Sequence, residues 1–408
     1  MKACSVVAVL VVALAATAVG CGGSEGGGSR TINWYVASQP GGGYDDAVAN
    51  CNKQNKGRFS IKYVRLPSDA NQQRELLVRR LAAEDSDIDI IGMDVPWTAE
   101  FAQAGWIQPW EGANRAYAVK DKLKGPLASV RYEDKVWGVP FTSNTQLLWY
   151  RKDKVKTPPK TWEAMIDQAV KDKSSIALTG RQYEGLSVLV NSLIASAGGQ
   201  IVNEDGKVQV DETATRAAEI LNRVALEAAA PGLNTAAEDD ARLAFQSGGP
   251  EFQVNYPFIF ASAAEEKGFQ EKIGWARFPR VDADRPSRPP LGGFNIGVSK
   301  YTENRDLAFQ AARCIAQPSN QVVAVEKEGL PPTTESVFDD PKVEKAYPFA
   351  DVLRESIEAA APRPVIPAYS DVSLAIQKTF HPEDKIKPDE IEDKLRDRLE
   401  KASEGKIF

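Results

Sequence analysis

The first third of the chain alternates short apolar runs with amphipathic segments. Apolar runs of strand length occur at 31–37, 59–66 and 88–94. Segments with a helical spacing of apolar residues follow them at 44–53, 71–84 and 99–104. Strands that alternate with helices are typical of a parallel sheet covered by helices on both faces. The pattern therefore predicts an α/β domain built on a doubly wound parallel sheet.

The stretch 135–153 combines an apolar strand with a polar centre. Residues 146–150 are apolar at nearly every position, which is typical of a strand buried on both faces. The polar run Thr142-Ser-Asn-Thr145 lies directly before them. Small hydrogen-bonding residues between two apolar halves indicate that the chain crosses here from one lobe to another, with polar groups facing a cleft. An ordinary strand with a polar bend is the alternative interpretation.

The remainder of the chain predicts a second lobe and two further crossings. Helices are expected at 161–172, 184–197, 211–230 and 305–316, and strands at 251–258 and 273–279. The glycines in 291–299 would let the backbone approach a ligand closely, so we interpret this segment as a crossing back to the first lobe. Gly329-Leu-Pro-Pro332 is expected to be the third crossing. Three crossings make both lobes discontinuous in sequence.

The N-terminal segment has the features of an export signal. Lys2 precedes an apolar core, residues 6–19, that is too short to span a bilayer. Ala18-Val-Gly-Cys21 resembles a bacterial lipobox, and a glycine- and serine-rich tether follows at 22–29. We expect a signal peptide and a lipidated Cys21, which would anchor the protein to the outer face of the cell membrane by lipid alone. Secretion without an anchor is the alternative.

Composition and charge argue against several kinds of chemistry. The net charge is −6, whereas a nucleic-acid partner would require a basic face. The chain contains a single histidine, His381, so we expect neither a histidine-activated nucleophile nor a zinc site. The sequence lacks a Walker-type phosphate loop. We therefore expect no metal and no cofactor.

Four polar residues lie where the carboxyl ends of the predicted strands meet. They are Gln39, Asn71, Gln72 and Asp94. Ligands of doubly wound sheets bind in the crevice outside these strand ends, which makes the four residues candidate ligand contacts. Each has a structural alternative, since Asn71 would also serve as a helix N-cap and Asp94 would also cap the turn that follows it.

Short motifs occur in a characteristic order along the whole chain. After the lipobox and its tether come Met93-Asp-Val-Pro-Trp-Thr-Ala-Glu-Phe101, Thr142-Ser-Asn-Thr-Gln-Leu-Leu-Trp-Tyr150, Val254-Asn-Tyr-Pro-Phe258, Gly292-Gly-Phe-Asn295, Gly329-Leu-Pro331 and Arg363-Pro-Val-Ile-Pro-Ala-Tyr369. In this order the motifs resemble those of the extracellular solute-binding lipoproteins of sugar ABC transporters. Within that group the chain looks most similar to the mycobacterial trehalose-recycling lipoprotein.

The resemblance implies a two-lobed, maltose-binding-protein-like fold in which each lobe is a sheet flanked by helices. The expected parts are a signal peptide at 1–20, a lipidated tether at 21–30, an N-terminal lobe at 31–143 and 292–332, and a C-terminal lobe at 144–291 and 333–408. It also implies that Cys51 and Cys314 form a disulfide, which the sequence of an exported protein by itself favours, although two buried thiols are the alternative.

The resemblance further implies a binding function without catalysis. The protein would capture a disaccharide, trehalose or another α-glucoside, and deliver it to the permease subunits of an ABC importer with a cytoplasmic ATPase. We expect a monomer. A disaccharide presents hydroxyl groups around apolar C–H faces, which suits planar polar side chains and aromatic surfaces.

The ligand set that the resemblance implies comes from both lobes. It contains Asn71 or Gln72, Asp94, Asn144, Gln253, Tyr256, Gly293, Phe294 and Arg363. Two positions depart from the family pattern, since Gln253 stands where a glutamate is expected and Tyr256 where a tryptophan is expected. An amide forms weaker hydrogen bonds than a carboxylate, so the first change would alter the preference for particular hydroxyl groups.

A lipid-anchored glycoside hydrolase acting on small oligosaccharides is the alternative function. It requires two carboxylates about 5–10 Å apart across the cleft. Asp94 is the acid that stands out in the expected site, and the glutamine at position 253 removes the natural second one. A surface lipoprotein without a ligand would leave the polar strand ends unexplained. The sequence therefore favours a binding protein.

Overall fold

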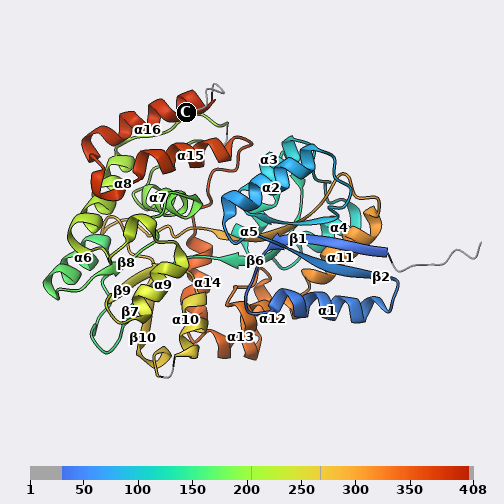
Figure 1. Cartoon of the computed structure of the whole chain (residues 1–408), viewed down its shortest axis with the longest axis horizontal. Helices are drawn as coiled ribbons and strands as arrows, with labels where there is room; N and C mark the ends of the chain where they lie inside the picture. The colour runs from blue at the N-terminus through green and yellow to red at the C-terminus, as the bar shows by residue number, and fades with distance from the viewer. Residues whose placement is uncertain (1–29, 204, 267, 404–408) are drawn as a thin grey trace, which may run out of the picture.

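The computed structural model describes residues 30–203, 205–266 and 268–403. These residues form two lobes, each built around a sheet with helices on both faces (Figure 1). The expected signal peptide, the lipidation site Cys21 and the tether up to residue 29 lie outside the described ranges. Within those ranges, no helix has the length and apolarity that crossing a membrane requires.

The sheet of the N-terminal lobe has five strands in the order β2–β1–β3–β11–β6. They are β1 (Arg30–Ala37), β2 (Phe59–Leu66), β3 (Ile90–Asp94), β6 (Val139–Asn144) and β11 (Gly292–Val298). β1 pairs in parallel with β2 and β3, as the alternating pattern predicts. β11 is antiparallel to both β3 and β6, because the chain re-enters the sheet at the end where β6 leaves it. The sheet is therefore mixed and not purely parallel.

Helices bury both faces of this sheet. They are α1 (Gly43–Asn55), α2 (Ala70–Ala82), α3 (Trp97–Gln103), α4 (Gly112–Val119), α5 (Lys124–Ser129), α11 (Arg305–Ile315) and α12 (Pro318–Glu328). Successive side chains of a strand point to opposite faces. Trp34 of β1 accordingly belongs to the apolar cluster under α1 and α11, and Tyr35 to the cluster under α2 and α3. A hairpin of β4 (Arg131–Tyr132) and β5 (Lys135–Val136) leads into β6.

The sheet of the C-terminal lobe has four strands in the order β10–β7–β9–β8. They are β7 (Leu147–Arg151), β8 (Ile176–Ala177), β9 (Phe252–Asn255) and β10 (Ile273–Arg277). Helices again bury both faces (Figure 1). They are α6 (Trp162–Lys171), α7 (Glu184–Ser196), α8 (Glu212–Arg223), α9 (Glu238–Gln246), α10 (Phe258–Ser262), α13 (Pro341–Ala346), α14 (Ala350–Ala359), α15 (Tyr369–Phe380) and α16 (Pro388–Ser403). The helix expected at 211–230 changes to a π-helical turn at Val224–Ala228.

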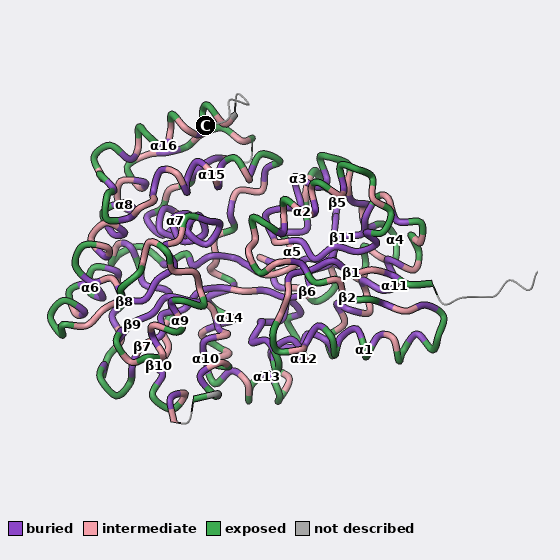
Figure 2. Tube along the Cα trace, viewed as in Figure 1, coloured by how far each residue is buried: buried purple, intermediate pink, exposed green. Residues whose placement is uncertain are grey.

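Three segments cross between the lobes, as predicted. The chain passes from β6 in the first sheet to β7 in the second, and returns between β10 and β11. The third crossing follows α12 and runs beside the first, where the Ser143 N–H donates to the Pro331 carbonyl at 2.8 Å. The polar run 142–145 is therefore a crossing and not a bend within one strand. Figure 2 shows that the backbone between the lobes is largely buried.

The lobes also share apolar packing beneath the crossings. Val322 and Val325 of α12 lie in one buried cluster with Leu353 and Ile357 of α14. Figure 1 shows α12, α13, α14 and α10 together along this edge of the molecule. The lobes are therefore packed together on one side, and the cleft described below separates them.

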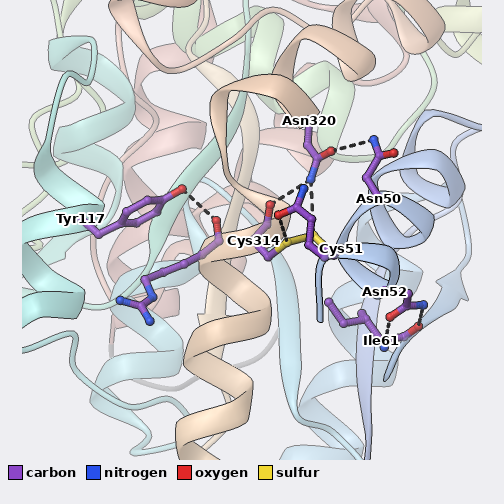
Figure 3. The surroundings of a disulfide bond; sticks show 9 residues. Asn50, Cys51, Asn52, Ile61, Tyr117, Cys314 and Asn320 are labelled. Atoms are coloured by element: carbon purple, nitrogen blue, oxygen red, sulfur yellow. Dashed lines mark hydrogen bonds between the residues drawn. A yellow bond between two sulfur atoms is a disulfide. The ribbon is translucent and has the colours of Figure 1, made fainter. Parts of the chain in front are cut away.

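A disulfide joins Cys51 of α1 to Cys314 of α11 (Figure 3). The two Cα atoms are 5.9 Å apart. Asn320 lies beside the bond and is fully buried. Its Nδ2 donates a hydrogen bond to the Cys314 carbonyl at 2.9 Å. The pairing implied by the resemblance is confirmed, and it lies within the N-terminal lobe.

Glu383, between α15 and α16, carries a buried carboxyl group without a polar partner. The residue is 1% exposed, and neither carboxyl oxygen has a hydrogen-bond partner among the described residues. Burial raises the pKa of this carboxyl to about 8. The folded protein therefore holds the proton more tightly than the unfolded chain. As pH rises from about 4.5 to about 8, this difference lowers the free energy of unfolding.

Glu383→Gln should remove that pH dependence. We expect the variant to gain up to about 5 kcal/mol in unfolding free energy relative to wild type between pH 4 and pH 9, since each pKa unit is worth about 1.4 kcal/mol. Denaturant unfolding of both proteins across this pH range measures the difference and cancels the contribution of all other groups. A difference that stays constant with pH would contradict the assignment.

Candidate functional site

A cleft of about 750 Å³ lies between the lobes. The N-terminal lobe contributes the loop after β1, the start of α2 and the end of β3. The C-terminal lobe contributes the starts of α7 and α9 and the turn between β9 and α10. The crossings contribute Asn144 and the start of β11. The cleft thus lies at the carboxyl ends of β1 and β3, where ligands of such sheets bind.

The structure brings seven of the ten expected ligand residues to this cleft. They are Gln39, Asp94, Asn144, Tyr256, Gly293, Phe294 and Arg363. Both aromatic residues in this set are partly buried, and burial raises the pKa of the Tyr256 hydroxyl. The seven come from six separate parts of the sequence and from both lobes.

Asn71 and Gln72 do not line the cleft, because of the rotation of α2. The helix begins after Asp69, whose carboxylate caps it by accepting the Gln72 N–H at 3.1 Å. The N-cap of α2 is therefore Asp69 and not Asn71, for which the sequence analysis considered this role. Successive helical residues point about 100° apart, so Gln73 faces the cleft while its two predecessors are exposed.

Gln253 does not line the cleft either. It is fully buried within β9, and its neighbours Phe252 and Val254 point into the cluster under α7 and α8. The alternation of a strand turns Gln253 to the opposite face of the sheet. Neither atom of its amide has a hydrogen-bond partner among the described residues.

A buried ion-pair network lies at the border of the cleft. The Arg363 guanidinium, 4% exposed, donates two hydrogen bonds to the Asp94 carboxylate at 2.7 and 3.0 Å, and one to Glu184 at 2.5 Å. Burial opposes the charge of Arg363, but the two carboxylates outweigh it and raise the pKa of this guanidinium. Asp94 also caps the next turn by accepting the Val95 N–H at 2.8 Å. The structural alternative considered for Asp94, capping of the turn that follows it, is therefore present, and Asp94 also forms an ion pair with Arg363.

Glu184 was missed by the sequence analysis. Besides Arg363, it accepts hydrogen bonds from Tyr369 and, at 2.5 Å, from Ser373, both on α15. An acidic residue in the first turn of an otherwise apolar, buried helix was the available signal. The expectation that Asp94 is the one prominent acid of the site was therefore wrong. Both carboxylates thus bind the same guanidinium.

Two buried polar atoms in the cleft wall have no hydrogen-bond partner among the described residues. They are Oε1 of Gln73, an acceptor, and Nε of Arg363, a donor. An unpaired buried group costs about 1–3 kcal/mol, so both favour a ligand that supplies the missing partners. A hydroxyl group can donate to the first and accept from the second kind of atom. Both residues thus bring an unpaired polar atom to the wall of the cleft.

A second set of contacts connects the lobes near the start of α9. Arg181 forms an ion pair with Asp69 at 2.8 Å and lies 4.1 Å over the ring of Tyr183. The Tyr183 hydroxyl donates to Glu238, and burial raises the pKa of that carboxyl to about 7. The ion pair is partly exposed, so its own contribution to stability is small. Tyr183 and Glu238 add an aromatic face and a carboxyl group to the cleft.

The glycine-rich loop after β1 is held by one carboxylate. Glu328 at the end of α12 accepts the N–H groups of Gly41 at 2.8 Å and Gly43 at 2.5 Å. A Cβ on Gly41 would lie 2.1 Å from the Lys327 carbonyl, so the loop can approach α12 only with glycine there. This contact fixes the loop that carries Gln39.

Gly293 permits the close pairing of β11 with β6 at the crossing. Its φ of 117° lies where other residues are strained, and a Cβ would lie 2.1 Å from the Thr142 carbonyl. Gly293→Ala should lower the free energy of unfolding by roughly 3 kcal/mol. Gly249→Ala is the matched control, because that Cβ would meet no atom within 4 Å. Equal unfolding midpoints of the two variants in denaturant would contradict this prediction.

Two lobes, three crossing segments and a polar cleft between the lobes define a two-lobed periplasmic-binding-protein fold. Residues 37–322 match the sequence profile described as bacterial extracellular solute-binding protein, and the chain belongs to this family. The family and the fold are those of substrate-binding proteins and not of enzymes. Members of an extracellular family act outside the cytoplasm. No group of three or more potential metal ligands occurs among the described residues.

Individual relatives support the same fold. The chain is 26% identical to a probable ABC transporter-binding protein of Deinococcus radiodurans, over 85% of this chain and 87% of that one. The structure of maltose-bound MalE3 of T. maritima superposes with a TM-score of 0.83, at 23% identity over 92% of this chain and 99% of its own. The GacH receptor of Streptomyces glaucescens, solved with and without acarbose, gives a TM-score of 0.80 at 23% identity, over 92% and 98%. At these identities the two structures establish the fold alone.

Proposed function

We propose that this protein is the binding component of a sugar ABC importer and holds a disaccharide, trehalose first among the α-glucosides, in the interlobe cleft. The observation that carries the proposal is the presence of two unpaired buried atoms in the cleft wall, Oε1 of Gln73 and Nε of Arg363. A sugar hydroxyl can donate a hydrogen bond to an acceptor such as Oε1 and accept one from a donor such as Nε. An apolar ligand would leave both atoms unpaired, which would make binding weaker.

The aromatic residues of the cleft suit the apolar faces of sugar rings. Tyr183, Tyr256, Phe258 and Phe294 all contribute to its wall. The relatives are consistent with this chemistry, since MalE3 was solved with maltose and GacH with acarbose. Gln253 lies away from the cleft, so of the two departures from the family pattern only Tyr256 bears on specificity.

The proposed mechanism is closure of the lobes around the ligand. A sugar that contacts both lobes stabilises the closed form over the open one, because only the closed form makes all the contacts. The permease subunits, with their cytoplasmic ATPase, would then recognise the closed lobes. A lipid on Cys21 would keep the protein near the permease on the outer face of the membrane.

Calorimetric titration of the protein, produced from Gly22 onward, with trehalose, maltose and sucrose tests the proposal. Micromolar or tighter binding of trehalose, with compaction in small-angle scattering, is the expected result. If only maltose or sucrose gave a heat of binding, trehalose would be excluded as the ligand, and the proposed role in sugar transport would stand. The absence of a heat of binding with all three sugars would contradict the proposed disaccharide ligand.

A further inference from the structure

The glycine-rich loop after β1 has the geometry of an anion-binding site. Gly42 lies in the left-handed region with a φ of 79°, and the N–H groups of Gly41 and Gly43 on either side of it converge on one carboxylate. They lie at the start of α1, a helix of 13 residues whose N-cap has no side-chain hydrogen bond of its own. Converging N–H groups and the positive end of a helix dipole both attract an anion. Because Gly41 lines the cleft, this site faces the ligand.

A side chain of the protein itself occupies this site. Glu328, the last residue of α12, is 8% exposed, and its two oxygens accept the N–H groups of Gly41 at 2.8 Å and Gly43 at 2.5 Å. The carboxylate therefore uses both donors of the loop. It also places a negative charge in the cleft wall, because Glu328 lines the cleft as well. A negatively charged group of a ligand would meet a like charge here and no free donor.

The positive groups of the cleft wall are neutralised in the same way. Arg363 binds the carboxylates of Asp94 and Glu184. Lys327 forms an ion pair with Asp46 at 3.7 Å. Among the described residues that line the cleft, these two bases are outnumbered by six acids, which are Asp94, Glu184, Glu238, Asp239, Glu326 and Glu328. A cleft lined mainly by one sign of charge has a potential of that sign, which is negative here.

From these observations we propose that Glu328 is a specificity-determining residue, which fills the anion site of the loop and restricts the cleft to ligands without a phosphate or carboxylate group. The proposal rests on the proposed sugar-binding function and specifies the charge of the sugar. The neutral sugar binds, and its phosphorylated and acidic derivatives are rejected. The hydroxyl groups of a neutral sugar donate to carboxylate oxygens, so the acids that repel an anion remain acceptors for the ligand.

Inorganic phosphate tests the anion site without any sugar. Glu328→Ala removes the carboxylate and frees both N–H groups, so calorimetric titration should show phosphate binding about tenfold or more tightly to this variant than to wild type. Asp45→Ala is the matched control. It removes the same charge from the first turn of α1, but Asp45 pairs with Arg65 and not with the loop. Phosphate binding of equal strength to Glu328→Ala and to either wild type or the control would overturn the proposal.

Pairs of neutral and phosphorylated sugars test the specificity. Whichever of trehalose, maltose and sucrose binds to wild type is compared with its 6-phosphate ester by calorimetric titration. We expect the ester to bind wild type roughly a hundredfold more weakly than the neutral sugar. Glu328→Gln keeps the shape of the side chain without its charge, so it should reduce this difference by about tenfold. The ratio of the two affinities cancels any effect of the substitution on the position of the loop.

The outcomes separate this inference from the proposed function. An ester that binds wild type as tightly as the neutral sugar, or a Glu328→Gln variant that keeps the full difference, would overturn the role of Glu328 and leave sugar binding in the cleft intact. The glutamine variant gives this answer even where the alanine variant does not fold. Absence of binding by all three sugars would overturn the proposed function and with it the specificity for a neutral sugar, and the phosphate titration would still decide whether the loop is an anion site.

Discussion

Arg363→Met should lower the free energy of unfolding by about 3–5 kcal/mol and reduce sugar affinity at least a hundredfold. The guanidinium is the cation shared by Asp94 of the N-terminal lobe and Glu184 of α7. The methionine side chain is of similar length to that of arginine, but it carries neither a charge nor hydrogen-bond donors. The substitution would therefore leave two buried carboxylates facing each other, and would also remove the unpaired Nε from the cleft wall.

The control for this prediction is an ion pair of the same type on the surface. Arg354 binds Asp339 at 2.6 Å, but the two side chains are 32% and 72% exposed. Arg354→Met should therefore cost less than about 1 kcal/mol and leave affinity unchanged. Arg363→Lys should recover part of the stability but little of the affinity, because an ammonium group cannot form the bidentate contact.

Chemical denaturation and calorimetric titration of the three variants separate the two effects. The change in stability depends only on the observed contacts, whereas the change in affinity also depends on the proposed ligand. If Arg363→Met unfolds at the same denaturant concentration as Arg354→Met, the network is not a source of stability. If it retains wild-type affinity for the sugar that binds, Arg363 is not a ligand contact.

Replacing both Cys51 and Cys314 by serine should lower the free energy of unfolding by about 5 kcal/mol while leaving sugar affinity unchanged. The bond closes a loop with a sequence separation of 263 residues. Cross-linking so long a loop removes much conformational freedom from the unfolded chain, and the loop-closure relation gives about 5 kcal/mol for this length. The bond joins α1 to α11 within one lobe and lies outside the residues that line the cleft, so binding should not depend on it.

Reduction of the wild-type protein provides the matched comparison. Reductant should shift the unfolding midpoint of wild type to that of the double serine variant, and should not shift the variant itself. A loss below about 1 kcal/mol would mean that the constraint does not act on the unfolded chain as the relation assumes. A loss of affinity in a variant that remains folded would mean that the bond also positions the glycine-rich loop carrying Gln39.

The local pattern of the sequence was sufficient to predict the architecture. The alternation of apolar runs and amphipathic segments predicted the strands and helices of the N-terminal lobe within a few residues, because side-chain periodicity is a property of neighbouring positions. The polar run 142–145 predicted the first crossing for the same reason. The antiparallel direction of β11 was not predicted, since strand direction depends on the end of the sheet at which the chain re-enters.

The sequence by itself thus determined the two-lobed fold and most of the segments that border the cleft, because both follow from local periodicity and from motifs. The tertiary structure alone decided which side chains reach the cleft. A shift of one residue separates Gln73 from Gln72, and the alternation within β9 turns Gln253 away. The Arg363 network joins residues as much as 269 positions apart, so no local pattern contains it. Only the packing of the two lobes brings these groups together.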